Sequence, residues 1–198
     1  MALDPAKTAL LLIDIQNDYW LPPRAPREQF VRAAHELLQL ARDDGMLVVH
    51  VQHARRDPGK GGFQPGTEGF EVHESVRPLA DEPRVAKHEA SSFYETGLDE
   101  LLQAGGIETV VIAGMQTQKC CDTTTREAKA RGYKCFFVTD AVETFDLRGP
   151  DGNVVGRDEI ARVTFAALHN GFATVVTLDE LKQLLELPDR AGSAAPSR

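Results

Sequence analysis

The stretch TVVIAGMQTQKCCDTTTREAKARGYKCFFVTDA, residues 109–141, indicates the fold of this chain. It opens with the apolar run 109–114, continues through the amphipathic segment 117–133 and closes on a second apolar run, 134–141. Continuous apolar runs are typical of strands covered on both faces, as in parallel sheets. A strand, a helix and a second strand in this order form a βαβ unit with a right-handed crossover.

The same alternation runs through the rest of the chain. Further apolar runs cover residues 8–15, 46–52, 84–88 and 173–178. Helical spacing of apolar residues predicts helices at 27–45, 97–106, 157–171 and 178–187. We therefore expect a three-layer α/β/α sandwich around a mostly parallel, Rossmann-like sheet of about six strands. Two long connections, 53–83 and 143–156, are either functional segments or solvated loops.

Length and composition bound the class of protein. With 198 residues and 42% hydrophobic content, the chain is long enough to bury a full core. We expect a single domain over residues 1–188 and a disordered polar tail over 189–198. The net charge of −8 argues against nucleic acid as a partner, because proteins that neutralise phosphate backbones gather Lys and Arg on one face.

The N-terminal apolar run and the cysteines bear on the compartment. The run is too short to cross a bilayer and is followed by acidic residues rather than a small-residue cleavage site, so no membrane partner is expected. Three cysteines, two of them adjacent, make a poor disulfide framework. We therefore expect a cytoplasmic protein in a reducing environment.

Chemically active side chains follow three of the predicted strands. Asp14 ends the first apolar run, Lys87 ends the run at 84–88, and Cys120 follows the run at 109–114 after a tight turn. Because ligands bind outside the carboxyl ends of the strands in such sheets, the three are expected to converge. An acid can take a thiol proton and a cation favours the thiolate. Taken singly, the acid is better explained as a strand-end cap and the lysine as a surface residue; only their convergence predicts an active site.

The adjacent cysteines differ in their expected surroundings. If Thr117 caps the following helix, positions 121, 124, 125 and 128 share one stripe of small residues that can pack on the sheet. Cys121 then belongs to the core, while Cys120 lies in the first helical turn, where free N–H groups stabilise a thiolate. This choice depends on where the helix starts, so geometry alone leaves Cys121 open as the nucleophile. Cys135 is expected to be a small core residue.

Three ordered motifs carry a family resemblance. They are LLIDIQNDY (11–19), VAKHEASSFYETGLDELL (85–102) and VVIAGMQTQKCCDTTTREAKARGY (110–133). Together they resemble the isochorismatase-like cysteine hydrolases, over roughly residues 8–178. The resemblance implies a catalytic Asp at the end of the first strand and a catalytic Lys before a small-residue/Phe segment, which fall on Asp14 and Lys87.

The resemblance also bears on the choice of nucleophile. The family's nucleophile closes a GxxTxxC motif, which Gly114, Thr117 and Cys120 match. A cis peptide bond is implied between Met115 and Gln116, with the backbone N–H groups of Gln116 and Cys120 directed at an oxyanion. By this register the nucleophile is Cys120.

The branches of the family differ in two respects that this sequence addresses. Isochorismatases proper lack the cysteine, so Cys120 favours hydrolysis of an amide or another C–N bond. Nicotinamidases carry an Asp and two His for a divalent metal, but His53 and Arg55 stand where that Asp and the first His should be. We therefore expect neither a metal nor an organic cofactor. His50, His53 and His73 are more typical of polar surface or substrate contacts than of metal ligands.

The remaining residues near the motifs are candidates for the pocket. The expected substrate contacts are Trp20, His53, Phe93 and Tyr94, although packing in the core or at the rim explains the aromatic residues equally well. The residues expected to orient the site are Gln16, Asp18, Met115 and Thr117. The resemblance implies a homodimer or homotetramer whose pocket borrows residues from a neighbour, with 143–156 as the candidate contact.

The predicted function is that of a cysteine hydrolase that cleaves a C–N bond in a small amide, ureido or carbamoyl compound through a thioester. No cluster of Lys and Arg in the sequence calls for a strongly anionic substrate. Three alternatives remain open at this level. They are a metal-assisted, nicotinamidase-like hydrolase, a thiol-based redox sensor and a catalytically silent binding or scaffold protein.

Overall fold

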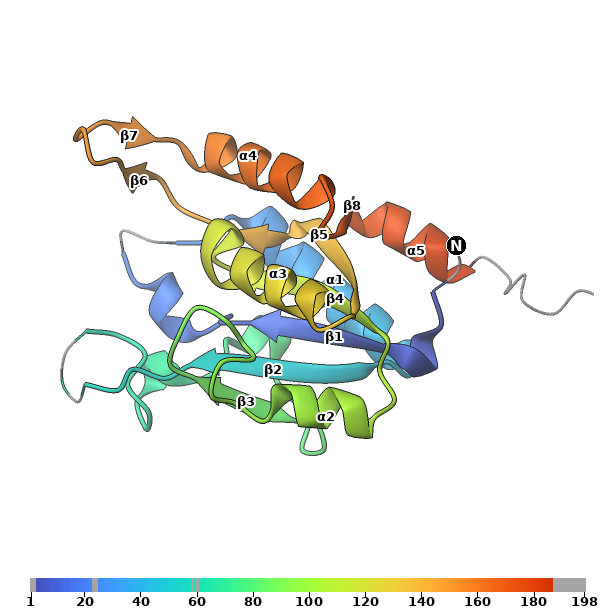
Figure 1. Cartoon of the computed structure of the whole chain (residues 1–198). Coiled ribbons are helices and arrows are strands. Elements are labelled where there is room, and N and C mark those ends of the chain that lie inside the picture. Colours follow the sequence, from blue (N-terminus) through green and yellow to red (C-terminus); the bar gives the residue numbers. More distant parts are fainter. Residues whose placement is uncertain (1–2, 23–24, 58, 60, 187–198) are drawn as a thin grey trace, which may run out of the picture.

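The computed structural model describes residues 3–22, 25–57, 59 and 61–186. Its centre is a six-stranded sheet with the strand order β3-β2-β1-β4-β5-β8 (Figure 1). Every neighbouring pair in this sheet is parallel, so the predicted sheet is confirmed. The strands are β1 (Thr8–Ile13), β2 (Leu47–His53), β3 (Arg84–Lys87), β4 (Thr109–Met115), β5 (Lys134–Glu143) and β8 (Thr174–Val176).

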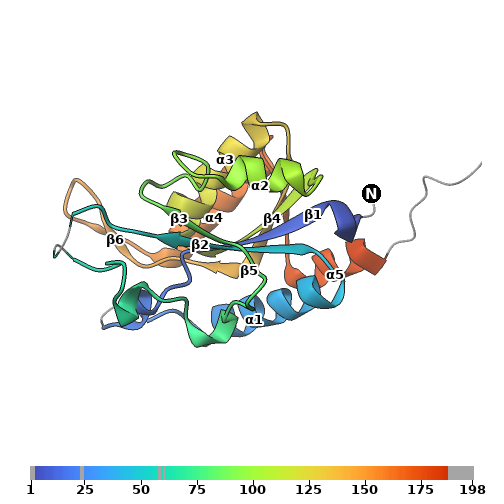
Figure 2. The same cartoon turned by 90° about the horizontal axis from the view of Figure 1, so that it is seen from below.

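Helices cover both faces of the sheet, which completes the predicted sandwich (Figure 2). One face carries α1 (Glu28–Asp43) and α5 (Leu178–Glu186). The other carries α2 (Leu98–Ala104), α3 (Asp122–Ala130) and α4 (Arg157–His169). Within the part of the chain that the structure describes, no helix combines the length and the apolar character needed to cross a membrane.

Short helical turns occupy several of the connections. The 3-10 turns are η1 (Pro5–Lys7), η2 (Asn17–Trp20), η3 (Glu68–Phe70) and η4 (Glu74–Val76), and a π-helical turn, η5 (Thr117–Cys121), runs directly into α3. The turns η3 and η4 lie within the long 53–83 connection, which contributes to the site described below.

The strands divide the apolar core into two halves. Along β1, Leu10 and Leu12 pack toward α1 and α5, whereas Ala9, Leu11 and Ile13 pack toward α2, α3 and α4. All five are essentially inaccessible to solvent. A strand that is apolar on both faces has no solvent-facing side, which is why its sequence is a continuous run rather than an alternating one.

The strand order places the sheet's switch point between β1 and β4. From β1 the chain moves outward through β2 to β3, then returns to the other side of β1 with β4 and continues to β5 and β8. In open parallel sheets the crevice at this reversal is where ligands bind. The segments that follow β1 and β4 carry Asp14 and Cys120 respectively.

Two segments differ from the sequence prediction. Residues 117–133 are not one α-helix, because the π-helical turn precedes α3. The 143–156 segment is not a plain loop, since it contains the antiparallel hairpin β6 (Leu147–Arg148) and β7 (Val154–Val155). The tail predicted over 189–198 lies outside the described residues.

Candidate active site

Three side chains from different strands meet at the carboxyl edge of the sheet. Asp14 directly follows β1, Lys87 is the last residue of β3, and Cys120 lies in η5 after β4. The Lys87 Nζ atom is 2.8 Å from Asp14 Oδ2 and 3.3 Å from Cys120 Sγ, and it also donates to the Glu89 carbonyl. The fractional exposures of Asp14, Lys87 and Cys120 are only 1%, 0% and 5%. The structure therefore brings together the three residues that the sequence predicts to converge.

The turn after β4 depends on a glycine. Gly114 has φ +126°, and a Cβ atom at this position would lie 2.0 Å from the Ile13 carbonyl oxygen of the neighbouring strand. No other residue fits such a close approach of two backbones. The next peptide bond, between Met115 and Gln116, is cis, at the position the sequence predicts.

Opposing influences act on the pKa of the Cys120 thiol. Burial, together with the neighbouring Asp14 carboxylate, raises the pKa of Cys120 to about 12, against the opposing effect of Lys87. Burial by itself lowers the pKa of Lys87, but Asp14 and Cys120 outweigh it and the net pKa is raised. Burial thus opposes the thiolate that the sequence predicts, whereas the contact with Lys87 favours it.

Asp14 is placed to take the thiol proton. Its two carboxylate oxygens are buried, and apart from the ion pair with Lys87 the described residues give neither oxygen a hydrogen bond. A buried carboxylate with free lone pairs beside a thiol can act as a base once the sulfur attacks, because proton transfer relieves the cost of the buried charge.

The π-helical turn contains both adjacent cysteines and places them in different surroundings. The Cys121 N–H donates to the Gln116 carbonyl at 3.2 Å, the i to i+5 bond of a π-turn. Cys121 is fully buried in the core with Ala128, whereas Cys120 lines a cavity. The predicted core stripe is confirmed, but the predicted cap is wrong, because the buried Thr117 hydroxyl has no hydrogen-bond partner in the described structure. Cys135 is buried, as expected.

A cavity of about 580 Å³ opens above Cys120. Loops after β1, β2, β3 and β4 all contribute to it, as expected for the carboxyl edge of a parallel sheet. The lining residues are Asp14, Tyr19, His53, Arg55, Arg56, Asp57, Phe63, His88, Glu89, Ala90, Gln116, Lys119 and Cys120. Gln116 and Cys120, the predicted sources of oxyanion N–H groups, thus both border the cavity.

Several lining residues were not predicted from the sequence. Tyr19 and Phe63 form one wall, with ring centroids 4.9 Å apart. Arg55 and Arg56, which are adjacent in the sequence, and the distant Lys119 add cationic side chains that meet only in the fold. The sequence offered one indication that these three cations line the cavity: they closely follow the ends of β2 and β4.

Three predicted substrate contacts lie elsewhere. Trp20 stacks on His73 with ring centroids 3.7 Å apart. Phe93 is buried against Tyr133 in the core, and Tyr94 is exposed to solvent. None of these aromatic residues lines the cavity above Cys120, and the alternative of packing fits Trp20 and Phe93.

Two polar residues fasten the 53–83 connection to the first loop. The Gln16 side chain accepts a hydrogen bond from the His53 N–H at 2.8 Å and donates to the carbonyls of His53 and Phe70. The Asp18 carboxylate accepts a hydrogen bond from the Phe63 N–H. A Cβ atom on Gly69 would collide with the same carboxylate, so the chain approaches Asp18 closely. These contacts fix the positions of His53 and Phe63 beside the cavity.

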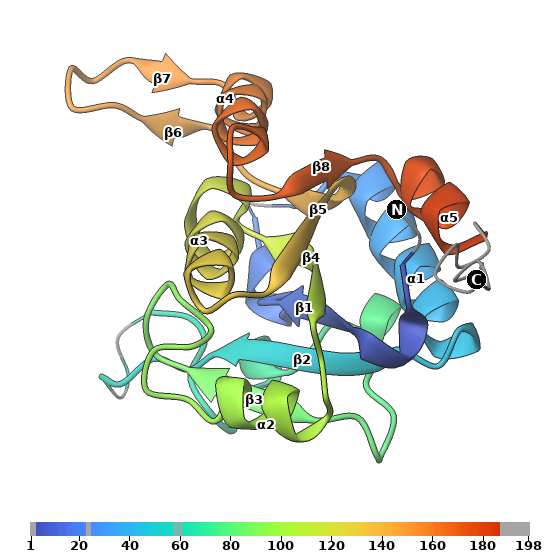
Figure 3. The ribbon, with the colours of Figure 1, turned by 45° about the vertical axis from the view of Figure 1, so that its right-hand side comes forward.

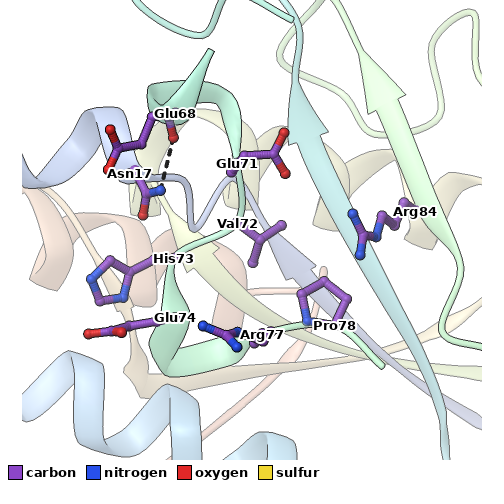
Figure 4. Close-up of a pocket in the computed structure, with 9 residues that line it drawn as sticks. All are labelled: Asn17, Glu68, Glu71, Val72, His73, Glu74, Arg77, Pro78 and Arg84. Atoms are coloured by element: carbon purple, nitrogen blue, oxygen red, sulfur yellow. Dashed lines mark hydrogen bonds between the residues drawn. The ribbon is translucent and has the colours of Figure 1, made fainter. Parts of the chain in front are cut away.

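The three histidines considered as metal ligands occupy separate environments. His53 lines the cavity, and His50 contacts Glu82. His73 borders a different hollow of about 570 Å³ with Glu74 and Arg77 (Figure 4). Across residues 3–22, 25–57, 59 and 61–186, no three His, Cys, Asp or Glu side chains are grouped to hold a metal ion. The donors present therefore do not fit a nicotinamidase-like metal site.

Glu82 secures the segment that leads into β3 and Lys87. Its carboxylate accepts two hydrogen bonds from Arg42, at 2.7 and 2.9 Å, one from the Leu79 N–H at 2.8 Å, and contacts His50 Nε2 at 2.9 Å. Burial alone raises the pKa of Glu82, but Arg42, the Leu79 N–H and His50 lower it to about 2. The folded-state pKa thus lies below the ordinary value of 4.5.

This depressed pKa predicts acid sensitivity. A carboxylate with a lowered folded pKa contributes stability above its ordinary pKa, and that stability is lost as the pH falls through the window from 4.5 to about 2. The shift corresponds to up to about 3 kcal/mol of unfolding free energy. In urea unfolding across this window, Glu82→Gln should show a flatter pH dependence than the wild type. Glu108→Gln, which removes an exposed carboxylate paired with Lys7, is the control; equal slopes in wild type and Glu82→Gln would contradict the assignment.

Comparison with known proteins places this site in a family. The family model named Isochorismatase domain matches residues 8–180, a span that includes Asp14, Lys87 and Cys120. The chain belongs to the isochorismatase family. An uncharacterized isochorismatase family protein of Bacillus subtilis, YddQ, is 40% identical over 175 residues, which cover 87% of this chain and 97% of the relative.

Two relatives with more specific names also match. The maleamate amidohydrolase of Pseudomonas putida is 32% identical over 180 residues, covering 77% of this chain and 84% of the relative. A crystal structure of a cysteine hydrolase from Pseudomonas syringae superposes with a TM-score of 0.85 at 26% identity, covering 94% of this chain and 95% of that one. The isochorismatase-family fold and a hydrolase activity are thereby supported.

Proposed function

We propose that this isochorismatase-family protein hydrolyses the amide or a related C–N bond of a small molecule, with Cys120 as nucleophile, Asp14 as base and acid, and Lys87 as electrostatic partner. The observation that carries the proposal is the buried contact of Lys87 with both Asp14 and Cys120 beneath one cavity. Titratable side chains that perturb one another at a cavity, with a nucleophile within reach of a base, are typical of an active site.

The first half-reaction forms a thioester. The Cys120 sulfur attacks the carbonyl carbon while its proton passes to Asp14, so that the buried thiol need ionise only as the new C–S bond forms. As the proton passes to Asp14, the negative charge moves to the sulfur and then to the carbonyl oxygen. Lys87 stabilises this charge. Backbone N–H groups of Gln116 and Cys120 stabilise the carbonyl oxygen. Collapse then breaks the C–N bond, and Asp14 returns the proton to the departing amine or ammonia.

The second half-reaction regenerates the thiol. Asp14, ionised again, takes a proton from water, which attacks the thioester carbonyl; the C–S bond breaks and the sulfur recovers the proton. The sum is amide plus water giving a carboxylic acid plus ammonia or an amine. Asp14 is ionised again at the end of the cycle, which restores its ion pair with Lys87.

The cavity supports a small polar substrate. At about 580 Å³ it lies within the range of small-molecule sites. The wall formed by Tyr19 and Phe63 can pack on a planar group. His53 lines the same space, and its Nδ1 atom has no hydrogen-bond partner among the described residues. Three free cysteines, all buried, are in keeping with a reaction in the cytoplasm.

A substrate panel tests the proposal. We expect ammonia release from at least one small primary amide or carbamoyl compound in a set that includes maleamate, nicotinamide, carbamoyl amino acids and biuret. Activity should persist after exhaustive dialysis against a chelator. Activity that is lost on chelation and restored by zinc or manganese would instead support a metal-assisted hydrolase. Reversible oxidation of Cys120 without hydrolysis of any compound in the panel would support a redox sensor.

A further inference from the structure

The cavity above Cys120 gathers positive charge in an acidic protein. Its lining includes Arg55, Arg56 and Lys119, although the whole chain has 30 acidic and only 22 basic residues. Figures 1 and 3 show that the connections after β2 and β3 lie at the same end of the sheet as the start of α3. Arg55 follows β2, and Lys119 lies in η5, which runs into α3. The sequence shows no cluster of Lys and Arg because only the fold brings these two segments together.

The Arg55 side chain is held in place by the loop that faces it. Its backbone N–H donates to the Phe63 carbonyl at 3.0 Å, and its Nε atom donates to the Gly62 carbonyl at 3.2 Å. A Cβ atom on Gly61 would lie 3.5 Å from the Arg55 Cζ atom, so the loop backbone packs directly on the guanidinium group. Among the described residues, neither Nη atom has a hydrogen-bond partner. A guanidinium group held in this way is preorganised to donate two parallel hydrogen bonds to a carboxylate.

The other two cations differ in whether their charge is already paired. Arg56 forms an ion pair with Glu95. The Lys119 ammonium group has neither an ion pair nor a hydrogen bond among the described residues. Lys119 also directly precedes Cys120 in the chain, so an anion bound by both Arg55 and Lys119 lies close to the carbonyl under attack. Arg55 and Lys119 are therefore two unpaired cations at one cavity.

His53 adds a neutral polar group beside these charges. Burial lowers its pKa, and Lys87, Lys119 and Arg55 lower it further, against the opposing Asp14 carboxylate. Lys119 and Arg55 are thus near enough to His53 to act on it. A neutral imidazole keeps one N–H donor, which can bind a carboxylate oxygen.

We propose that the substrate is a short amide that also bears a free carboxylate, which Arg55 binds through its two Nη groups and Lys119 neutralises. This inference rests on the proposed function, because it names the class of amide that Cys120 hydrolyses. Tyr19 and Phe63 would pack on the chain between the carboxylate and the amide. Since Phe63 also accepts the Arg55 N–H, one loop supplies both the aromatic wall and the support of the carboxylate site. A fixed charge at one end of the substrate orients the amide at the other end.

Three matched compounds test the charge of the substrate. Succinamate, succinamide and 4-aminobutanamide share a primary amide and end in a carboxylate, a neutral amide and an ammonium group. We expect kcat/KM for ammonia release to be roughly 10-fold to 100-fold higher for succinamate than for succinamide, the range of one charge-assisted contact. Homologues that are one carbon longer should show the same order. Equal values would overturn the proposal, as would a preference for the ammonium compound, which the exposed acids Asp57 and Glu89 at the same cavity would explain.

Substitutions in the cavity test the role of Arg55. Arg55→Gln should raise KM for succinamate by roughly 10-fold to 100-fold with a smaller change in kcat, and should remove most of the preference over succinamide. Lys119→Gln should act in the same direction. Arg84→Gln, which removes an exposed arginine of β3 outside the cavity, is the control and should keep the preference. An equal loss for succinamate and succinamide in Arg55→Gln would show a structural role only and would refute the carboxylate site.

Binding without turnover separates this inference from the proposed reaction. In isothermal titration of the Cys120→Ala protein, succinamate should bind at least about 10-fold more tightly than succinamide, and the added Arg55→Gln change should abolish the difference. Hydrolysis that depends on Cys120 but shows no preference for succinamate would refute the carboxylate site and leave the proposed function standing. Preferential binding of succinamate by a wild type that hydrolyses no amide would support the carboxylate site and refute the proposed reaction.

Discussion

Replacing Cys120 with Ala is expected to lower kcat by roughly 10⁴-fold or more, because no thioester can form without the sulfur. The side chain is small and lies at the edge of the cavity, so the fold and the ion pair between Asp14 and Lys87 should persist. Ammonia release under saturating substrate, with the free energy of unfolding measured in parallel, checks this result.

The adjacent cysteine supplies the matched control. Cys121→Ala removes the same atoms from a fully buried position in the core. We expect it to lower the free energy of unfolding by about 1–3 kcal/mol and to leave kcat within several-fold of the wild type. If Cys121→Ala abolished turnover while Cys120→Ala retained it, the assignment of the nucleophile would be reversed.

Replacing Asp14 with Asn is expected to lower kcat by about 10²-fold to 10⁴-fold, the range of a lost general base. The amide keeps an oxygen that can accept a hydrogen bond from Lys87, but it cannot take the thiol proton. Burial contributes most to the raised pKa of Cys120, so the loss of the neighbouring base that accepts its proton is expected to slow the attack. Steady-state kinetics should therefore show the loss in kcat, with a smaller change in KM.

A variant at Asp122 distinguishes the effect of losing a base from the effect of losing a nearby negative charge. It lies two residues after Cys120, and its carboxylate is paired with Arg126 on α3. Asp122→Asn removes one charge near the thiol without touching the cavity, so it should change kcat by less than about 10-fold. Equal losses in Asp14→Asn and Asp122→Asn would mean that electrostatics alone, rather than proton transfer, explains the effect.

Much of the fold was predictable because buried strands and helices have recognisable patterns of apolar residues. The residues of β1 face helices on both sides, so 9–13 had to be apolar throughout. The convergence of Asp14, Lys87 and Cys120 followed from the rule that parallel strands end at one edge, together with the family resemblance. The position of Gly114, which the close approach of two backbones requires, also marks the turn that carries the proposed nucleophile.

The parts that could not be predicted depend on contacts between distant segments. Trp20 stands one residue after Tyr19, yet only Tyr19 lines the cavity, because the short turn η2 sends the neighbouring ring toward His73. Phe63 is held beside the cavity by the hydrogen bond from its N–H to Asp18. No pattern in the sequence around Phe63 predicts this contact. The charge state of Cys120 likewise depends on burial, a property that its sequence neighbours do not reveal.

The covalent intermediate is the most direct test of the account. During turnover of an active amide, rapid acid quenching and peptide mass spectrometry should find the acyl group, without its amine, attached to Cys120. The adduct should be absent from the Cys120→Ala protein. An acyl group on Cys121, or full turnover by the Cys120→Ala protein with no adduct on any cysteine, would contradict the central claim.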